Sequence, residues 1–472
     1  MPKTSFDAVT APPSASALAL ARLAHSSSWT QHPPEVVAHA LRIVRDTLGV
    51  MLGGSTLAEV RKLAGMSPEL GAGGATILGS RHTAAGHVAA LVNGTGGVSL
   101  ELDEGNQYAV NHPSIHMLPA LWALAEERDA SGAQLMHAFI VGYEIAVRVG
   151  AATRLRGPVH PFGTHTIVGT AAGAAVLLGL DAAQTATALE LAAGLCIASS
   201  QNAANAGASV RNLFTGFTNH NGLLAVRLAQ AGFSGEPGAL ESVFGKVLGS
   251  AFDLRVGTAL QPYYITRNYF KIHACSRWNH APIEAMAAIL ASRDIALDAI
   301  EEIEVHTYDP ATRLSGTSVA NAYAAKHSIP YNVAARAVYG SNALDVYTDA
   351  HLRDPRLQAL LGKIRVLEDP ALTTLLPGIR AGRVSVRMSS GQVHTVQSEQ
   401  PRGGHDNPLG EQELVEKFRL LAGMALPAER VDALLEAIPR LPDLGSVRAV
   451  SELLRGLAEE PPAAGRRPRE SD

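Results

Sequence analysis

The sequence predicts a mainly α-helical protein with a second, smaller α+β domain, and three observations indicate it. The chain has 472 residues, too many for one ordinary hydrophobic core, so two domains are expected. Apolar residues with helical spacing dominate residues 17–265, whereas strand-like alternation begins only after residue 266. Aromatic residues make up only 5% of the chain while Ala and Gly abound, which favours closely packed helices over a β-sandwich.

The first predicted domain, residues 17–265, is all-helical. Its first clear helix follows Pro34, carries an apolar stripe, and is expected to end at Gly53-Gly54. Several later segments are apolar on nearly every side, which predicts helices buried in a larger helical body. Those helices are expected at Leu118–Glu127, Gly132–Ala152, Thr166–Leu180, Ala182–Ala198 and Asn219–Ala231.

Two glycine-rich segments, Gly71–Gly74 and Gly94–Gly97, interrupt this domain. Both lack the third glycine and the strand–helix context of a dinucleotide-binding loop. We therefore predict that both are turns.

The second predicted domain, residues 266–405, mixes strands with short helices. Ile303, Val305 and Thr307 alternate with polar residues, as in a half-buried strand. Val384–Met388 and Val393–Val396 flank a Ser-Gly turn, which predicts a hairpin. A further strand is expected at Lys363–Leu367, and helices at Ala281–Ala291, Asn332–Val338 and Leu357–Leu361.

The chain turns helical again at its C-terminal end. Residues 406–460 are predicted to return to the first domain through helices at Gln412–Leu421, Pro427–Ala437 and Val447–Leu457. Residues 461–472, rich in Pro, Gly and charge, are predicted to be disordered.

Composition argues against several function classes. A net charge of −4 gives no general attraction to nucleic acids or anionic membranes, so neither is an expected partner. The two cysteines, Cys196 and Cys275, are too few for a disulfide framework or for a cysteine-ligated iron–sulfur cluster. The N-terminal segment lacks the apolar core of a signal peptide, and the apolar run Ile167–Leu180 is too short to span a bilayer. We therefore expect a cytoplasmic protein.

Three segments concentrate chemically active side chains. They are Glu101-Leu-Asp-Glu-Gly-Asn with the nearby Asn111-His-Pro-Ser-Ile-His, then His160-Pro-Phe-Gly-Thr-His, and finally Lys271-Ile-His-Ala-Cys-Ser-Arg-Trp-Asn-His280. Together they resemble the MmgE/PrpD family, which includes 2-methylcitrate dehydratases, cis-aconitate decarboxylases and iminodisuccinate epimerases. The resemblance continues through Gly132–Arg148 and Lys326-His-Ser-Ile-Pro-Tyr331 and ends near Lys417-Phe, so it covers almost the whole chain.

The resemblance implies a large helical domain, a smaller α+β lid and an active site in the cleft between them, usually in a homodimer. It also implies a cofactor-independent lyase, either a dehydratase or a decarboxylase, that acts on a citrate-like di- or tricarboxylate. Matched to the family motifs, the expected catalytic residues are His112, His160 and Lys271. The expected substrate-binding residues are Glu101, Asp103, Asn106, Arg211, Arg277, His280 and Tyr331.

These residue types suit proton transfer α to a carboxylate. Both proton abstraction and loss of CO2 add negative charge to a fragment that is already anionic. Fixed cations where that charge develops lower the barrier, and Arg211, Lys271 and Arg277 are the candidates. A histidine that titrates near neutrality can take one proton and return another, so His112 or His160 is expected to protonate the leaving group.

Two alternatives remain open from the sequence. Where many family members carry lysine and histidine, this chain has Arg211 and Phe214, which keeps the positive charge and loses the imidazole. That departure admits an epimerase of an imino- or amino-dicarboxylate. A metal enzyme is the second alternative, although the spacing matches no standard metal motif. Its candidate ligands are Asp103, Glu104, His112, His116 and His160.

Overall fold

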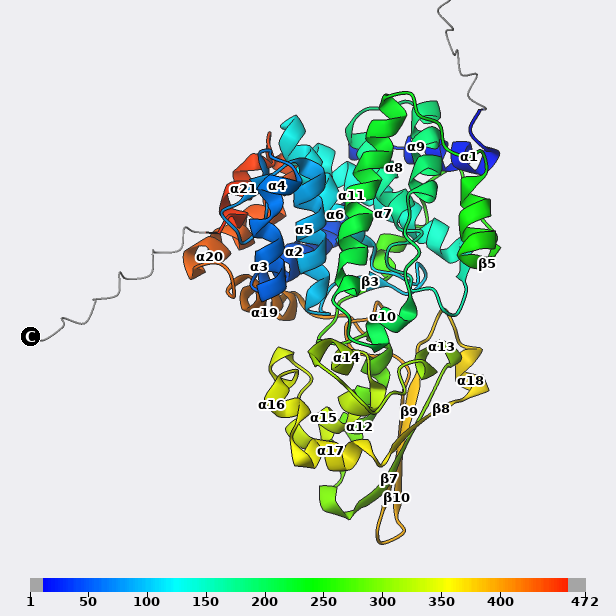
Figure 1. Cartoon of the computed structure of the whole chain (residues 1–472), viewed down its shortest axis with the longest axis vertical. Helices are drawn as coiled ribbons and strands as arrows, with labels where there is room; N and C mark the ends of the chain where they lie inside the picture. The colour runs from blue at the N-terminus through cyan, green and yellow to red at the C-terminus, as the bar shows by residue number, and fades with distance from the viewer. Residues whose placement is uncertain (1–11, 457–472) are drawn as a thin grey trace, which may run out of the picture.

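The computed structural model describes residues 12–456, which form a large helical domain and a smaller α+β domain (Figure 1). We use "lid domain" for residues 266–405 and "helical domain" for the rest. The predicted fold class, mainly helical with a smaller α+β domain, is confirmed. The predicted disordered tail, residues 461–472, lies outside the described residues.

The helical domain is a stack of helices around one apolar core. Helices α5, α6, α7, α8 and α11 pack against one another in its centre. Local sequence sets their ends: Pro113 stands at the first position of α6, and Ser131 with Gln134 forms a capping box at the start of α7. The helices are α1 (Ala15–Ala24), α2 (Pro34–Ser55), α3 (Ala58–Gly65), α4 (Ser67–Leu70), α5 (Gly86–Ser99), α6 (Pro113–Arg128), α7 (Gly132–Ala152), α8 (Ile167–Leu177), α9 (Ala182–Gly194), α10 (Gln201–Asn205) and α11 (Val210–Gln230).

Helix α7 is the core helix of this domain. It alone, within residues 12–456, is long and apolar enough to cross a membrane, but 89% of its apolar window is buried inside the protein. Its buried residues include Phe139 and Tyr143 on one helix face and Val141 and Ile145 on the opposite face. Burial on all sides explains why its sequence is apolar all round.

One of the two predicted glycine turns is wrong. Gly94–Gly97 lies inside α5, because the glycines serve helix packing and not a turn. A Cβ on Gly54 of α2 would overlap the carbonyl oxygen of Gly96, and a Cβ on Gly97 would overlap Ile115. The helices approach so closely that only glycine fits, and the penalty glycine imposes on a helix is offset by packing. For the same reason α2 continues past the predicted stop at Gly53-Gly54 to Ser55.

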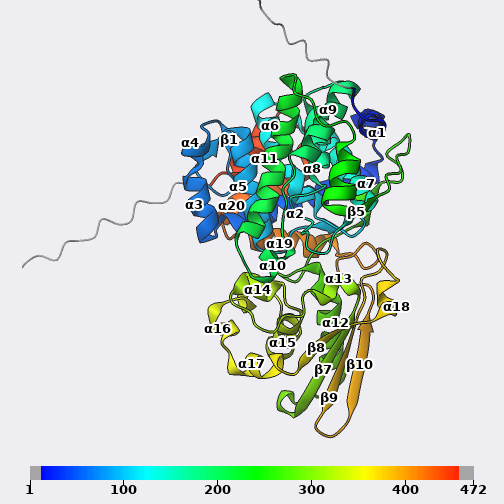
Figure 2. The same cartoon turned by 45° about the vertical axis from the view of Figure 1, so that its right-hand side comes forward.

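The lid domain contains a four-stranded sheet of order β10-β9-β7-β8. Its strands are β7 (Ile300–Thr307), β8 (Ile364–Glu368), β9 (Gly382–Met388) and β10 (Val393–Ser398). Strands β7 and β8 are parallel, while β9 pairs antiparallel with both β7 and β10. Helices cover one face of the sheet (Figure 2). Among them α12 packs against β9 and β10, and α15 against β8. The helices of the lid domain are α12 (His280–Ser292), α13 (Asp309–Thr312), α14 (Ala322–Lys326), α15 (Ile329–Tyr339), α16 (Asp349–Leu352), α17 (Pro355–Leu361) and α18 (Pro370–Thr373).

The C-terminal helices pack on the helical domain, beside its first helices (Figure 1). They are α19 (Glu411–Ala422), α20 (Ala428–Ala437) and α21 (Arg448–Leu454). Helix α19 lies along α2, where Phe418 packs against Gly49 and Lys417 forms an ion pair with Asp46 at 2.7 Å. The chain therefore crosses between the two domains twice.

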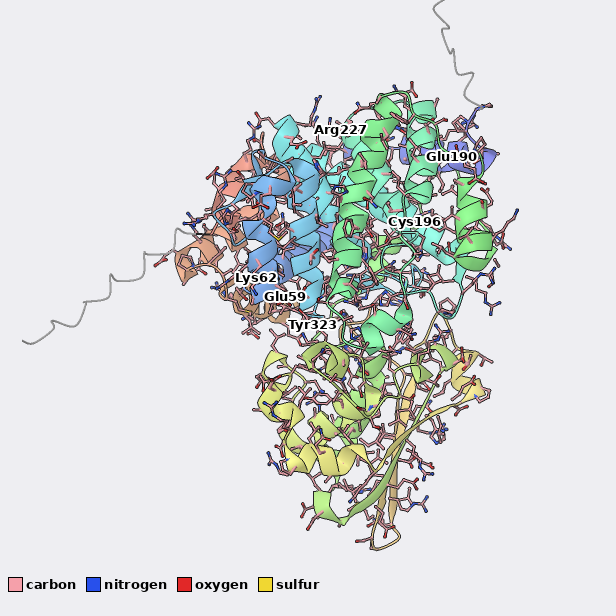
Figure 3. All side chains as sticks on the ribbon, in the orientation of Figure 1. Glu59, Lys62, Glu190, Cys196, Arg227 and Tyr323 are labelled. Atoms are coloured by element: carbon pink, nitrogen blue, oxygen red, sulfur yellow. The ribbon has the colours of Figure 1, made fainter. Side chains whose placement is uncertain are left out.

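Short strands and polar contacts join the domains. Strand β3 (Gly105–Asn106) pairs with β6 (Asn268–Tyr269), so the segment before Lys271 is fixed to the helical domain. Figure 3 shows Tyr323 of the lid domain close to Glu59 of α3, and the tyrosine hydroxyl donates a hydrogen bond to that carboxylate. The remaining short strands are β1 (Ala75–Thr76), β2 (Thr83–Ala84), β4 (Thr153–Leu155) and β5 (Gly249–Phe252).

Candidate active site

A pocket lies between the two domains, and residues from both line it. The helical domain contributes Glu101, Asn111, His112, His160, Phe162, Gln201 and Arg211. The lid domain contributes Tyr269, Ser276, Arg277, Leu314, His327 and Arg380. Five of the predicted site residues therefore meet at one place, although they lie up to 176 positions apart in the sequence.

The acidic loop, residues 100–104, forms one wall of the site. It connects the end of α5 to β3, and its Glu101 adopts a left-handed backbone conformation with φ of 58°. A residue other than glycine holds this conformation only where its surroundings enforce it. The side chains of Glu101 and Asp103 are buried and both point to the lid-domain lysine Lys271.

His112 is positioned by Asp103. It precedes Pro113 at the start of α6, and its Nδ1 lies 2.6 Å from Asp103 Oδ2. Its Nε2 lies 3.3 Å from the hydroxyl of Tyr269. Burial lowers the pKa of His112, although Asp103 opposes that shift. The neutral ring therefore keeps its proton on Nδ1, beside the carboxylate, and offers Nε2 as a proton acceptor.

Glu101 is the centre of an ion-pair cluster. Its carboxylate pairs with Arg211 and lies 3.1 Å from Lys271 Nζ and 3.9 Å from His327 Nε2. Lys271 also lies 3.3 Å from Asp103 Oδ1. Although burial alone would raise it, Arg211 and Lys271 hold the pKa of Glu101 well below its usual range. Lys271 is fully buried behind the pocket, so it acts on the acidic loop and does not line the cavity.

His160 has the opposite tautomer to His112. Its Nδ1 accepts a hydrogen bond from the backbone N–H of Phe162 at 3.1 Å, so its proton is on Nε2. Burial, reinforced by the neighbouring Arg211, lowers its pKa well below the usual value and keeps the ring neutral. Both imidazoles stand edge-on to the ring of Phe162, with centroid distances of 4.9 Å for His112 and 4.8 Å for His160. One imidazole is thus an acceptor and the other a donor.

Three arginines and one carboxylate line the pocket. Arg277 donates to the carbonyls of Pro401 and Arg402 and lies over the ring of Tyr269. Burial lowers its pKa to about 10, so it remains charged at neutral pH. Within residues 12–456, no carboxylate lies within ion-pair distance of Arg277. A buried guanidinium without a counter-ion makes this pocket suited to an anion.

Arg211 also has bonding capacity to spare. It stacks over Phe162, with 4.2 Å from the guanidinium carbon to the ring centroid. Its buried Nε has no hydrogen-bond partner among the described residues, while one terminal nitrogen binds Glu101. Arginine in this position can therefore receive a carboxylate from the pocket while Glu101 holds it in place.

Four predicted substrate-binding residues do not line the pocket: Asp103, which contacts His112 and Lys271 from behind it, and Asn106, His280 and Tyr331. Asn106 holds the turn after β3, accepting hydrogen bonds from Tyr108 and Ala109 and donating to the carbonyl of Tyr264. His280 is buried against His273, and its Nδ1 lies 3.1 Å from Arg277. The hydroxyl of Tyr331 donates to the carbonyl of Val346 at 2.5 Å. Asn106 and Tyr331 therefore bond within their own segments, whereas the buried Nε2 of His280 has no hydrogen-bond partner among the described residues.

Several pocket residues were not predicted as site residues, and Gln201, Tyr269, His327 and Arg380 are among them. His327 stands inside a segment that carries the family resemblance, and Tyr269 stands two residues before Lys271. Position within or directly beside those segments was the available signal. No sequence motif surrounds Gln201 or Arg380, so neither could be predicted as a site residue; only the tertiary fold brings them to the pocket.

The predicted metal ligands have other partners. Glu104 accepts hydrogen bonds from the hydroxyls of Ser114 at 2.6 Å and Tyr143 at 2.5 Å, and burial raises its pKa to about 7. His116 donates from Nδ1 to the carbonyl of His112, so its Nε2 accepts from the hydroxyl of Thr215. Within the part of the chain that the structure describes, no three His, Cys, Asp or Glu side chains converge as metal ligands. Glu104 instead anchors the acidic loop to α6 and α7.

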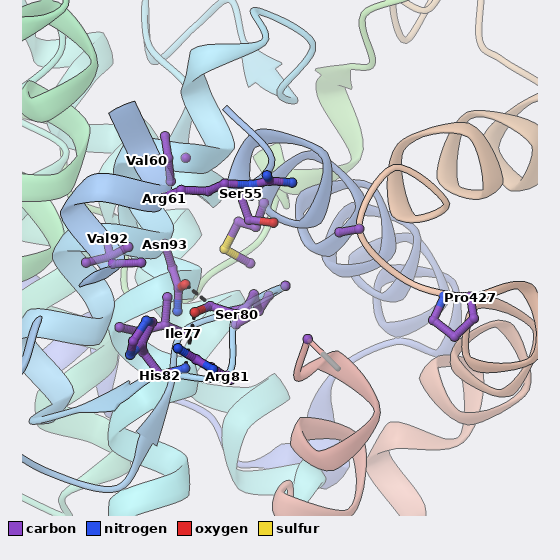
Figure 4. A pocket seen from close by; sticks show the side chains of 17 residues that line it. Ser55, Val60, Arg61, Ile77, Ser80, Arg81, His82, Val92, Asn93 and Pro427 are labelled. Atoms are coloured by element: carbon purple, nitrogen blue, oxygen red, sulfur yellow. Dashed lines mark hydrogen bonds between the residues drawn. The ribbon is translucent and has the colours of Figure 1, made fainter. Parts of the chain in front are cut away.

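A second hollow lies on the helical domain, between α2, α3, α5 and the C-terminal helices (Figure 4). Ser55, Arg61, Ser80, Arg81 and His82 surround an apolar floor. It shares no lining residue with the pocket between the domains. Gly456, the last residue that the structure describes, is also part of the lining of this hollow.

The chain belongs to the MmgE/PrpD family. The model of the family's N-terminal domain matches residues 18–253, and that of its C-terminal domain matches residues 273–441. The second match extends beyond the lid domain into α19 and α20, although these helices pack on the helical domain.

Curated relatives define the enzyme class. The chain is 26% identical over 443 residues to cis-aconitate decarboxylase of Homo sapiens, covering 89% of this chain and 90% of that protein. It is 25% identical over 410 residues to cis-aconitate decarboxylase of Aspergillus terreus, covering 79% of this chain and 82% of that protein. A 2-methylcitrate dehydratase of Cupriavidus necator is 30% identical over 232 residues, 45% of this chain and 48% of that protein. Decarboxylases and dehydratases of this kind are lyases, and this chain is a lyase.

Proposed function

We propose that this lyase acts on a citrate-like di- or tricarboxylate, without a cofactor, by proton transfer at the carbon α to a carboxylate. The arrangement that supports the proposal is the Asp103–His112 pair facing a pocket lined by three arginines. The relatives named for cis-aconitate and 2-methylcitrate fit a substrate of this charge and size.

The arginines bind the substrate in this proposal. Arg277 and Arg380 come from the lid domain and Arg211 from the helical domain, so carboxylates of one molecule bridge both. Arginine forks match carboxylates in two-point contacts and stabilise the charge that develops on proton loss. Phe162, close to both His160 and Arg211, and Phe214, close to His160, exclude water from one side of the site.

The two imidazoles divide the proton transfers. In a dehydration, His112 takes the α-proton at Nε2, with Asp103 stabilising the imidazolium that forms. His160 donates its Nε2 proton to the departing hydroxyl, which leaves as water, and the carbon–carbon double bond forms from the electrons of the broken C–H bond. In a decarboxylation the bond to CO2 breaks instead, and an imidazole protonates the carbon left behind.

Epimerisation is the second candidate. Two imidazoles of opposite tautomer flank one aromatic ring, so one can remove a proton from a carbon while the other returns a proton from a different direction. Such a reaction suits an imino- or amino-dicarboxylate, and the loss of the family histidine at Phe214 leaves both of these imidazoles in place.

The test is ultraviolet absorbance with 2-methylcitrate, citrate and cis-aconitate, in parallel with NMR in deuterated water. Appearance or loss of the conjugated double bond supports a lyase on these acids. Deuterium entering an amino-dicarboxylate at the α-carbon without net consumption supports the epimerase. Folded protein that neither binds nor turns over any of these acids rules the proposal out. Activity that survives exhaustive chelation supports the cofactor-independent reaction, and activity restored only by an added metal contradicts it.

We further propose a homodimer that works in the cytoplasm. Three large apolar side chains, Val210, Phe217 and Leu224, are exposed along α11 at seven-residue spacing, which places them on one helix face. Such a stripe supports contact with a second copy of the chain. Both cysteines are unpaired, which suits a reducing compartment.

A further inference from the structure

Two lysines hold the backbone of the acidic loop from outside it. Lys326, the last residue of α14 in the lid domain, donates from Nζ to the carbonyl oxygen of Leu100 at 2.9 Å. Lys417, in α19, donates from Nζ to the carbonyl oxygen of Leu102 at 2.7 Å. The two carbonyls belong to the residues on either side of Glu101.

Lys326 is an unusual buried cation. It is 5% exposed, and no carboxylate lies within ion-pair distance of it among residues 12–456. Besides the carbonyl of Leu100, its ammonium faces the ring of Tyr347 at 5.5 Å. An ammonium group is expensive to bury without a counter-ion, so its placement on one loop carbonyl indicates a specific task.

Lys417 adds a second attachment with a different partner. Its side chain is 11% exposed and forms an ion pair at 2.7 Å with Asp46 of α2, whose side chain is 3% exposed. The carbonyl of Leu102 is therefore tied through Lys417 to both α19 and α2. Carbonyl–ammonium bonds of this kind are charge-assisted and short, so they restrain the backbone more firmly than neutral hydrogen bonds.

The restrained residues are the ones that the site depends on. Glu101, between the two held carbonyls, has the left-handed φ of 58°, and Asp103 directly follows Leu102. In this backbone conformation Glu101 pairs with Arg211 and Lys271, and Asp103 lies 2.6 Å from His112. A loop released from either lysine can relax toward φ below zero and move both carboxylates.

We propose that Lys326 and Lys417 are positioning residues that clamp the acidic loop and so set the Asp103–His112 geometry. The clamp also links lid docking to the chemistry, because Lys326 reaches Leu100 only when the lid domain is seated on the helical domain. This inference rests on the proposed function, since the clamp affects turnover only if Asp103 and His112 carry the proton transfer.

The experiment compares Lys326→Met and Lys417→Met with Lys363→Met in the full chain. Methionine keeps the stem and removes the donor. Lys363 is the matched control, because its Nζ also donates to a backbone carbonyl, that of Ile300 at 2.5 Å, but inside the lid sheet. Hydrogen–deuterium exchange of peptides covering residues 100–106 reports on the loop, and steady-state kinetics report on turnover.

We expect faster exchange in residues 100–106 for both test variants and unchanged exchange there for the control. The value of kcat should fall by about 10²-fold with a smaller change in KM, because a loop displaced by an ångström misplaces the base more than the arginines. Lys326→Arg and Lys417→Arg, which retain a donor, should recover part of the loss.

The experiment must also distinguish loss of the clamp from a failure to fold and from a failure of the proposed function. If Lys417→Met fails to fold, Lys417→Met combined with Asp46→Asn removes the buried charge together with its partner. Loop exchange and kcat within twofold of the control in both test variants overturn the clamp. If the unaltered protein turns over none of the acids, the proposed function fails, while the exchange data still decide whether the lysines hold the loop.

Discussion

At the residue scale, the pairing of Asp103 with His112 is the feature most open to test. Asp103→Asn should lower kcat about 10²-fold or more, because the asparagine amide can face Nδ1 and move the ring proton to Nε2. His112→Asn should be at least as damaging. Steady-state kinetics of both single variants and the double variant measure the coupling.

The double variant provides the control. If Asp103 acts through His112, adding Asp103→Asn to His112→Asn costs little further activity. Losses that multiply would mean that Asp103 serves the reaction independently of the imidazole, for instance through Lys271, which it also contacts.

Glu104 should make stability depend on pH. Burial raises its pKa from 4.5 to about 7, so between these values the folded chain holds a proton that the unfolded chain releases. Its contribution to stability is complete below the unfolded value and is lost as pH rises through the folded one. Glu104→Gln imitates the protonated form, so its free energy of unfolding relative to the unaltered protein should improve from about pH 5 to about pH 8. Denaturant titrations at both pH values measure this, and a difference independent of pH contradicts it.

Sequence reasoning succeeded for residues inside recognisable segments and failed elsewhere. His112, His160, Arg211 and Glu101 were predicted from family motifs, and the structure brings them together. Arg380 lies in a stretch without any motif, and the fold alone delivers it to the pocket. Asn106, in contrast, lies inside a family motif but does not line the pocket, because its side chain forms hydrogen bonds within its own turn.

At the element scale, the contact between α2 and α5 depends on glycine. Gly54→Ala should destabilise the protein by about 1–3 kcal/mol, because a Cβ there overlaps the backbone of α5 and forces the helices apart. Gly65→Ala, near the end of α3, is the matched control, since a Cβ there meets nothing within 4 Å. It should leave stability unchanged or raise it by about 0.4–1 kcal/mol. Equal effects of the two changes on the urea midpoint would contradict this account.

The same helices show what periodicity can and cannot predict. Helix α7 was predicted with its observed ends, because a capping box and an apolar sequence agree there. Helix α11 begins at Val210, nine residues before its predicted start, since Asn212 and Gly216 are poor helix formers that packing overrides. The glycines of α5 were wrongly predicted to form a turn, again because packing decides. They permit close contact with Gly54 and Ile115, which are distant in the sequence.

At the scale of the whole molecule, the proposed dimer has a direct test. Light scattering should give twice the mass of the chain, because the proposed dimer buries the apolar stripe on α11 against a second copy. Phe217→Arg combined with Leu224→Arg should halve that mass, while the same changes at the exposed Val393 and Leu367 of the lid sheet should not. A monomeric unaltered protein contradicts the proposal.

The two-domain architecture could be predicted from the sequence, but the contacts that join the two domains could not. The alternation at Ile303–Thr307 and the hairpin that begins at Val384 predict a sheet. The structure contains the corresponding strands β7 and β9. No pattern indicates that β3 pairs with β6 or that Lys417 reaches the acidic loop, because such contacts join positions far apart in the chain.

The reach of Lys417 affects the order in which the protein matures. Leu102 is synthesised 315 residues before the lysine that holds it. A nascent polypeptide can fold its early helices as they leave the ribosome, yet its acidic loop stays incompletely supported until α19 has emerged. If the proposed mechanism holds, competence for proton transfer arrives only near the end of translation, and truncated products that stop before α19 should retain much of the fold without acquiring the reaction.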